Sequence, residues 1–167
     1  TKVAREVMVP RTDAFMVDIQ DDVQENINLI LGENYSRIPV YSEDKDKIVG
    51  ILHTKTLLKA ARNLGFENIE LGAIIQEPLF VPETIFIDDL LYELKRTQNQ
   101  MAILLDEYGG VVGLATLEDL LEEIVGEIDD ETDEVENLYT QVADNEYLVQ
   151  GRMLIDEFNE VFETDLH

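Results

Sequence analysis

The 167-residue chain contains no cysteine, so it has neither a disulfide framework nor a thiolate metal site, as is typical of a reducing compartment. It has no run of about 18 apolar residues and no signal-peptide pattern, so this stretch is predicted neither to span a bilayer nor to direct its own export. Hydrophobic residues nevertheless make up 45% of the chain, which excludes a disordered protein and suffices for one ordinary core or two small units.

Basic residues are scarce. The chain has 12 Lys and Arg against 37 Asp and Glu, with a formal net charge of −25. No Lys or Arg occurs between Thr97 and Gly151. Binding to nucleic acid or to an anionic lipid leaflet needs a concentrated Lys/Arg face, so neither partner is expected. The acidic residues are interpreted mainly as a solvated surface, with a divalent-cation or regulatory role for some of them as the alternative.

Groups for catalysis are few as well. One of the two histidines, His167, is the last residue, and there is no cysteine nucleophile. A hydrolytic triad therefore has no obvious base. Paired carboxylates carry little information in so acidic a chain. We expect no enzymatic activity.

What the chain does have is an internal repeat. Segments 35–58 and 100–121 each contain an apolar strand, a polar turn, a second apolar strand and the start of a helix. Gly50 corresponds to Gly113, and Leu57-Leu58 to Leu120-Leu121, at an offset of 63 residues. A repeated unit of this kind predicts two similar half-modules packed on each other, with sites in the clefts between them.

Periodicity and capping signals place the elements of each half. After a short helix that ends before Pro10, the first half is predicted to have a strand at 15–17, a helix between the cap Asp22 and Gly32, strands at 37–41 and 47–52, and a helix at 54–63. The second half is predicted to have a strand at 80–81, a helix capped by Asp88, strands at 101–105 and 111–115, and a helix from the cap Thr116 to Gly126. The fold class is α/β (α+β).

The composition changes after Gly126. Seven acids and no base lie between residues 127 and 136, and this stretch lacks the glycine and glutamate positions of an EF-hand loop. We then expect a hairpin within 139–151 and an amphipathic helix at 154–162. About 30 residues cannot bury a core alone, so they are interpreted as the start of another domain, cut short in a fragment that begins without Met.

Thr116 and Asp119 lie where a predicted strand gives way to a helix. The free N–H groups and partial positive charge of a helix N-terminus suit a phosphate. The Thr116 hydroxyl can donate to a phosphate oxygen, and the Asp119 carboxylate can accept both hydroxyls of a ribose. Spacing alone leaves a plain capping box as an equal alternative.

Arg37 begins the segment Arg37-Ile38-Pro39 and is a candidate phosphate partner in a chain with so few bases. Pro39 cannot donate to a strand ladder, so backbone groups at this strand start stay free for a ligand. The alternative is an ion pair between Arg37 and one of the many acids. Thr12, in the loop after Pro10, is a weaker candidate for a hydroxyl or backbone contact.

Three motifs in order resemble one family: Val7 to Asp13, Tyr35 to Tyr41, and Asp106 to Ile128. They are similar to the CBS-domain pair of the CorC/HlyC (hemolysin-like, CNNM-related) magnesium/cobalt efflux family. The resemblance implies tandem CBS repeats of the β-α-β-β-α type, at 1–66 and 67–128, packed as a quasi-two-fold pair. An acidic linker at 129–137 and the truncated start of a transporter-associated domain at 138–167 would follow.

The resemblance further implies a regulatory module that binds AMP or ATP, in the cytoplasmic part of an inner- or plasma-membrane protein whose membrane domain lies upstream. Its site would combine Thr12, Tyr35, Ser36, Arg37, Ile38, Pro39, Thr116 and Asp119, with the base near Ile38-Pro39 and the ribose on Asp119. The symmetry-related site would need an acid at Thr56, so we expect one site per chain. The alternative is a module that dimerises and couples conformations without binding nucleotide.

Two further expectations concern partners. Glu118, Glu122 and Glu123 would oppose a polyphosphate, so Mg²⁺ is expected to accompany ATP. The pairs Leu57-Leu58 and Leu120-Leu121 predict a homodimer through the repeat helices, unless these leucines are all satisfied within one chain.

Overall fold

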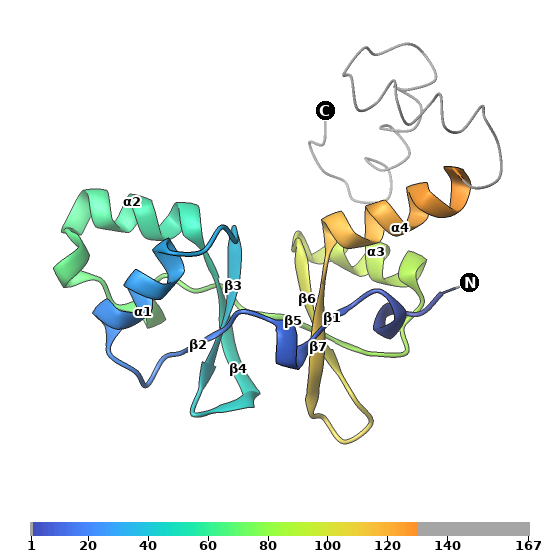
Figure 1. Ribbon diagram of the computed structural model, residues 1–167, viewed down its shortest axis with the longest axis horizontal. Coiled ribbons are helices and arrows are strands. Elements are labelled where there is room, and N and C mark those ends of the chain that lie inside the picture. The colour runs from blue at the N-terminus through green and yellow to red at the C-terminus, as the bar shows by residue number, and fades with distance from the viewer. Residues whose placement is uncertain (1, 130–167) are drawn as a thin grey trace, which may run out of the picture.

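The computed structural model describes residues 2–129, and side chains as far as residue 126. Two sheets lie side by side, and the helices of each half pack on its own sheet (Figure 1). The expected linker beyond residue 129, the hairpin within 139–151, the helix at 154–162 and the transporter-associated domain lie outside the described residues.

Each half contains one β-α-β-β-α unit. The first comprises β2 (Val17–Asp18), α1 (Val23–Leu31), β3 (Arg37–Ser42), β4 (Asp44–His53) and α2 (Thr54–Leu64). The second comprises β5 (Leu79–Pro82), α3 (Ile87–Thr97), β6 (Met101–Leu105), β7 (Val111–Thr116) and α4 (Leu117–Asp129). In both, the first strand is parallel to the second, which is antiparallel to the third. The predicted α/β fold of two such repeats is confirmed.

The predicted helix boundaries of the first half hold because the caps form as expected, whereas the strand predicted at 15–17 lies at 17–18 and the one predicted at 47–52 begins at Asp44. Asp22 accepts a hydrogen bond from the Glu25 amide at 3.1 Å and starts α1, and Gly32 ends this helix. Gly65 ends α2 with a φ of +83°, a conformation that glycine adopts without steric cost.

Two helix boundaries were wrongly predicted in the second half. Asp88 does not cap α3, because the helix begins earlier at Ile87, which is buried and donates its amide to the Lys2 carbonyl oxygen at 3.1 Å. Gly126 does not stop α4, which continues to Asp129. A glycine commonly ends a helix by taking a left-handed conformation, and Gly126 is not among the glycines with positive φ.

Three apolar clusters hold the molecule together. One lies between α1, α2 and the first sheet, and another between α3, α4 and the second sheet. The third joins the halves and contains Ile48 and Ile51 of β4 with Met101 and Ile103 of β6 and Leu114 of β7. Burial on both faces explains why β6 and β7 have few polar positions.

The halves also exchange short segments. β1 (Val9–Pro10) precedes the first half but pairs with β7 of the second, and Gln76 precedes β5 but exchanges two backbone hydrogen bonds, of 2.8 and 2.9 Å, with Ile51 of β4. The repeated glycines lie beneath these crossings. A Cβ on Gly113 would come within 2.4 Å of the Val9 carbonyl oxygen, and one on Gly50 within 2.7 Å of Ile75. The crossings therefore explain why both repeats carry glycine there.

Candidate functional site

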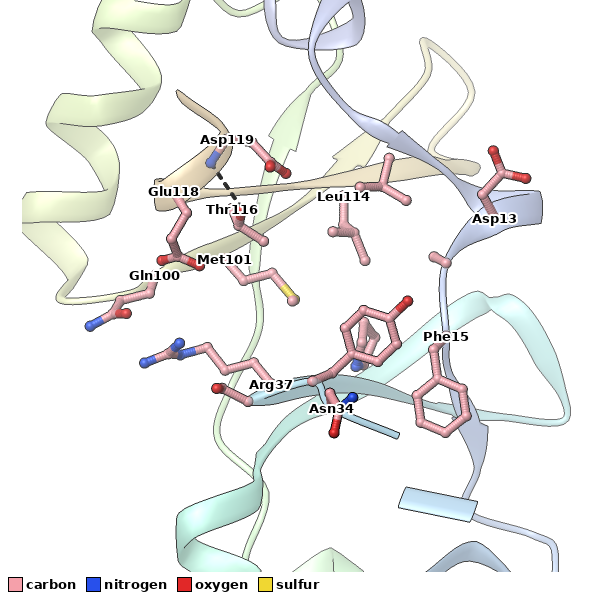
Figure 2. Close-up of a pocket in the computed structure, with 15 residues that line it drawn as sticks. Asp13, Phe15, Asn34, Arg37, Gln100, Met101, Leu114, Thr116, Glu118 and Asp119 are labelled. Atoms are coloured by element: carbon pink, nitrogen blue, oxygen red, sulfur yellow. Dashed lines mark hydrogen bonds between the residues drawn. The ribbon is translucent and has the colours of Figure 1, made fainter. Parts of the chain in front are cut away.

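A cavity of about 360 Å³ lies between the two halves, a size that suits a small organic ligand. Figure 2 shows side chains from both halves around it. The N-terminal segment and first half contribute Val9, Asp13, Ala14, Phe15, Asn34, Tyr35, Ser36, Arg37 and Pro39. The second half contributes Gln100, Met101, Leu114, Thr116, Glu118 and Asp119.

One side of the cavity is the junction between β7 and α4. The Thr116 hydroxyl oxygen accepts a hydrogen bond from the Asp119 amide at 3.2 Å, so Thr116 caps the helix as predicted. The remaining amides of the first turn and the helix dipole give this end a partial positive charge. The cap brings a hydroxyl and a carboxylate together at one cavity wall (Figure 2).

Arg37 lies across the cavity from this junction, at the start of β3. In the described part of the chain its guanidinium forms no ion pair, so the alternative of a structural salt bridge at Arg37 is not realised. Among the described residues, the site thus contains a cation without an ion-pair partner, opposite a helix N-terminus. This combination attracts an anionic group.

His53 pairs with Arg37 across β3 and β4. Burial, followed by the neighbouring charges of Arg37, Lys55 and Lys59, holds the pKa of His53 below its ordinary value. The neutral ring accepts a hydrogen bond from the Lys55 amide at its Nδ1, at 3.1 Å, and so caps α2. His53 therefore adds no further positive charge beside Arg37 at neutral pH.

Another part of the wall is apolar and aromatic. Phe15 and Tyr35 stack with ring centroids 5.8 Å apart and planes 12° apart. Pro39, Met101 and Leu114 supply aliphatic surface from both sheets. Flat apolar walls of this kind suit a planar ring, because aromatic faces stack and bury area together.

Of the eight residues that the sequence singled out, six line the cavity: Tyr35, Ser36, Arg37, Pro39, Thr116 and Asp119. Two do not. Thr12 is exposed in the 3-10 turn η2 (Arg11–Asp13), beside the cavity-lining Asp13. Ile38 is fully buried in the core of the first half, because alternate residues of β3 face opposite sides of the sheet.

Sequence reasoning missed Asp13, Phe15 and Gln100 as lining residues, whereas Glu118 was expected to lie near the phosphates of the ligand. The repeat carried a signal for Gln100, which corresponds to Arg37 at the offset of 63. Glu118 lies inside the Thr116–Asp119 motif that was already singled out. Phe15 had no local signal, because only the packing of Tyr35 beside it brings it to the wall.

A second, more acidic cavity of about 440 Å³ adjoins the first and shares Val9 and Asp119 with it. Its other lining residues are Glu6, Val7, Glu122 and Glu123. Glu123 pairs with Lys2, which offsets one of these charges. No group of three or more His, Cys, Asp or Glu side chains within the described residues is placed to hold a metal ion.

Known proteins agree with this architecture. The CBS-domain family model matches residues 4–63 and 71–126. The magnesium and cobalt efflux protein CorC of Escherichia coli K12 is 38% identical over 161 residues, which are 96% of this chain and 55% of that protein. Hemolysin C of Brachyspira hyodysenteriae is 40% identical over 159 residues, which are 95% of this chain and 58% of that protein.

Among solved structures, the CBS domain of a bacterial CNNM/CorC family Mg²⁺ transporter, in complex with ATP, is 39% identical with a TM-score of 0.69. The match covers 75% of this chain and 88% of that one. This chain therefore belongs to the CBS-domain family, as a CBS pair related to the CorC/HlyC/CNNM magnesium transporters. CorC is an efflux protein and the solved structure comes from a transporter, in agreement with the expectation that the chain is not an enzyme.

The chain spans between 37% and 58% of the length of the curated relatives that it matches. Within residues 2–129, no helix has both the length and the apolar character needed to cross a membrane.

Proposed function

We propose that this chain is the regulatory adenine-nucleotide-binding module of a CorC/HlyC-type membrane protein linked to magnesium or cobalt efflux. The observation that carries the proposal is the position of Arg37, which forms no ion pair within the described residues and faces the Thr116-capped helix N-terminus across a cavity of ligand size. The ATP complex of a related CBS domain supports the choice of ligand. The module would lie on the cytoplasmic side and follow a membrane domain in the same protein.

The roles of the residues follow from their chemistry. Arg37 and the Thr116 hydroxyl would bind phosphate oxygens, and Asp119 would accept both ribose hydroxyls. The base would lie against Pro39 and the neighbouring aliphatic wall, whereas Ile38 would support Pro39 from the core. Thr12 is exposed outside the lining residues, so its hydroxyl would contact only a ligand that extends beyond them.

Titration calorimetry with AMP and with ATP tests the proposal. We expect a stoichiometry near one per chain, because the symmetry-related position carries Thr56 in place of an acid. Two equivalent sites would contradict the single-site proposal. No binding of either nucleotide would favour the alternative, in which the module dimerises and transmits conformation without a nucleotide.

We also propose that the module forms a homodimer through its repeat helices. Leu57 and Leu120 are fully buried within their own halves. Leu58 is 48% exposed on α2, and its counterpart Leu121 is only partly buried on α4. Leu58 is thus left for an isologous interface, whereas Leu121 packs in part against the core of its own half.

Light scattering at high protein concentration tests this assembly. We expect a dimer mass for the wild type and a shift toward the monomer for Leu58→Asp. Tyr108→Asp is the matched control, since Tyr108 is 89% exposed on the turn between β6 and β7. A monomeric wild type would contradict the proposal.

A further inference from the structure

Arg11 lies in the middle of the segment that supplies one wall of the cavity. Val9 precedes it and residues 13–15 follow it as lining residues, whereas Arg11 itself does not line the cavity. This segment has little local support, because β1 has two residues and η2 is a single turn of three. Contacts from elsewhere must therefore hold the wall in place.

The Arg11 side chain makes such contacts with both halves. Its Nη1 donates to Asp46 Oδ1 at 2.6 Å and to the Val111 carbonyl oxygen at 3.2 Å. The Val111 amide donates to the same Asp46 oxygen at 2.9 Å. Asp46 belongs to β4 of the first half and Val111 begins β7 of the second. We call this ring of three residues the Arg11 clamp.

The backbone explains why the clamp forms at Val111. The pairing of β6 with β7 is irregular here, since Leu104 pairs with Gly113 but Leu105 pairs with Val111. β1 covers β7 only at Gly113 and Leu114, before the chain turns away into η2. The Asp46 carboxylate accepts from the Val111 N–H, and the Arg11 guanidinium donates to the Val111 C=O. These side chains thus satisfy backbone groups that a longer β1 would otherwise have to pair.

The clamp is only partly open to water. The Arg11 side chain is 33% exposed and the Asp46 side chain 47%. The hydrogen bond from the Val111 amide, together with the charge of Arg11, holds the pKa of Asp46 below its ordinary value. Asp46 is therefore charged at neutral pH and available to both partners.

We infer that Arg11 is a positioning residue for the ligand cavity: by binding Asp46 and Val111 it holds the wall segment 9–15 in place against both halves. The inference rests on the proposed nucleotide site. Without the clamp the same residues still line the cavity, but segment 9–15 is no longer held in place. Binding then has to order this segment, which weakens affinity.

Titration calorimetry with ATP tests the inference on the whole chain, at a temperature where circular dichroism shows every variant to be folded. Arg11→Gln and Asp46→Asn are each expected to weaken binding about tenfold, which corresponds to about 1.4 kcal/mol. The double variant is expected to bind no more weakly than the weaker single one, because both changes break the same clamp. If Arg11→Gln does not fold, Arg11→Lys replaces it.

Arg96→Gln is the matched control. It also removes an arginine and an ion pair of 2.6 Å, but this pair joins Arg96 to Glu93 within α3 and does not link the halves. We expect ATP affinity in this variant to equal that of the wild type. An equal loss of ATP affinity in Arg96→Gln and Arg11→Gln would mean that the change in net charge alone causes the effect, and would overturn the inference.

Hydrogen exchange measures the protection of individual wall amides, so it distinguishes a local effect on the wall from a change in overall stability. In the wild type, ATP is expected to slow exchange of the amides of residues 13–15, and in the clamp variants to slow it much less at equal occupancy. Absence of ATP binding by the wild type would overturn the proposed function. Wild-type binding with equal affinity and equal protection in the clamp variants would overturn only the role of Arg11.

Discussion

The two halves of the molecule share a fold but differ in chemistry at equivalent positions. Thr116 and His53 both cap the helix that follows the third strand of their half, one through a hydroxyl and the other through a ring nitrogen. Three residues later the second half has Asp119 and the first has Thr56. Folding requires only an acceptor at the cap, whereas ligand binding depends on which group provides it.

The charges around the two helix starts are opposite. Glu118 and Glu122 of α4 correspond to Lys55 and Lys59 of α2. At the strand starts the first half is again the more basic, since it has Arg37 where the second has an uncharged glutamine. The cavity therefore takes its cation from the first half and the Glu118 and Asp119 carboxylates from the second. The opposite combination lacks both, which supports one ligand site per chain.

The largest effect is expected from removing the acid that distinguishes the halves. Asp119→Ala should weaken AMP and ATP binding by about 1–3 kcal/mol, roughly 5- to 150-fold, the scale of hydrogen bonds to a charged group. Thr56→Ala, the same change at the equivalent position, should leave affinity unchanged. Calorimetry on both variants measures the difference, and equal losses would mean that the halves contribute alike.

A somewhat smaller effect is expected from the cation. Arg37→Ala should weaken ATP about tenfold more than adenosine, because only ATP carries phosphate for the guanidinium to bind. Gln100→Ala at the equivalent position should weaken both ligands to a similar degree. A competition assay with the two ligands distinguishes these patterns. Equal losses of ATP and adenosine in Arg37→Ala would place the phosphates elsewhere.

The acidic start of α4 should make ATP binding depend on magnesium. Glu118 lines the cavity and Glu122 lines the adjoining one, so both oppose a polyphosphate. A hard divalent cation can bridge carboxylate and phosphate oxygens. We expect ATP to bind several-fold more tightly in the presence of Mg²⁺, and the affinity for AMP to change much less. Glu118→Gln should reduce the effect of Mg²⁺ on ATP affinity, because the carboxylate attracts the cation over a few ångströms. ATP affinity that is unchanged by chelation at constant ionic strength would exclude this mechanism.

The smallest effect concerns the two helix caps. The pKa of His53 is lower in the folded chain than its ordinary value of about 6.5. When the pH falls below about 6.5, the unfolded chain therefore binds more protons at this residue than the folded chain does. This contribution to stability is fully present above that pH and is lost as the pH falls. We expect His53→Thr, which copies the cap of the other half, to lose less stability between about pH 7 and 5 than the wild type. Urea unfolding at a series of pH values measures this, and parallel curves would contradict it.

Much of the fold could be predicted because its signals are local. Asp22, Gly32 and Gly65 act on their own helix ends, and the repeat revealed the pairing of strands in each half. Prediction failed at Gly126, where a glycine can either continue a helix or end it. It also failed at Asp88, because the burial of Ile87 moves the start of α3.

The candidate site was predictable only in part. The Thr116 cap with Asp119, and Arg37 at a strand start, each carry a chemical signal within a few residues. Phe15 lines the cavity because it stacks on Tyr35, which is 20 residues away in the chain. Ile38 shows the opposite error, since it belongs to the same motif as Arg37 but faces the core. Neighbourhood in sequence thus does not determine which side of a strand meets a ligand.

The sequence by itself determined that two β-α-β-β-α units form and that only one of them carries the Thr116–Asp119 pair, because hydrophobic period, caps and residue identity are local properties. The tertiary structure decided which half supplies each wall of the cavity. It sends β1 to the opposite sheet and lets Arg11 join Asp46 to Val111, although these partners lie 35 and 100 residues away. Such contacts depend on how two packed halves meet, and no short stretch of the chain contains that information.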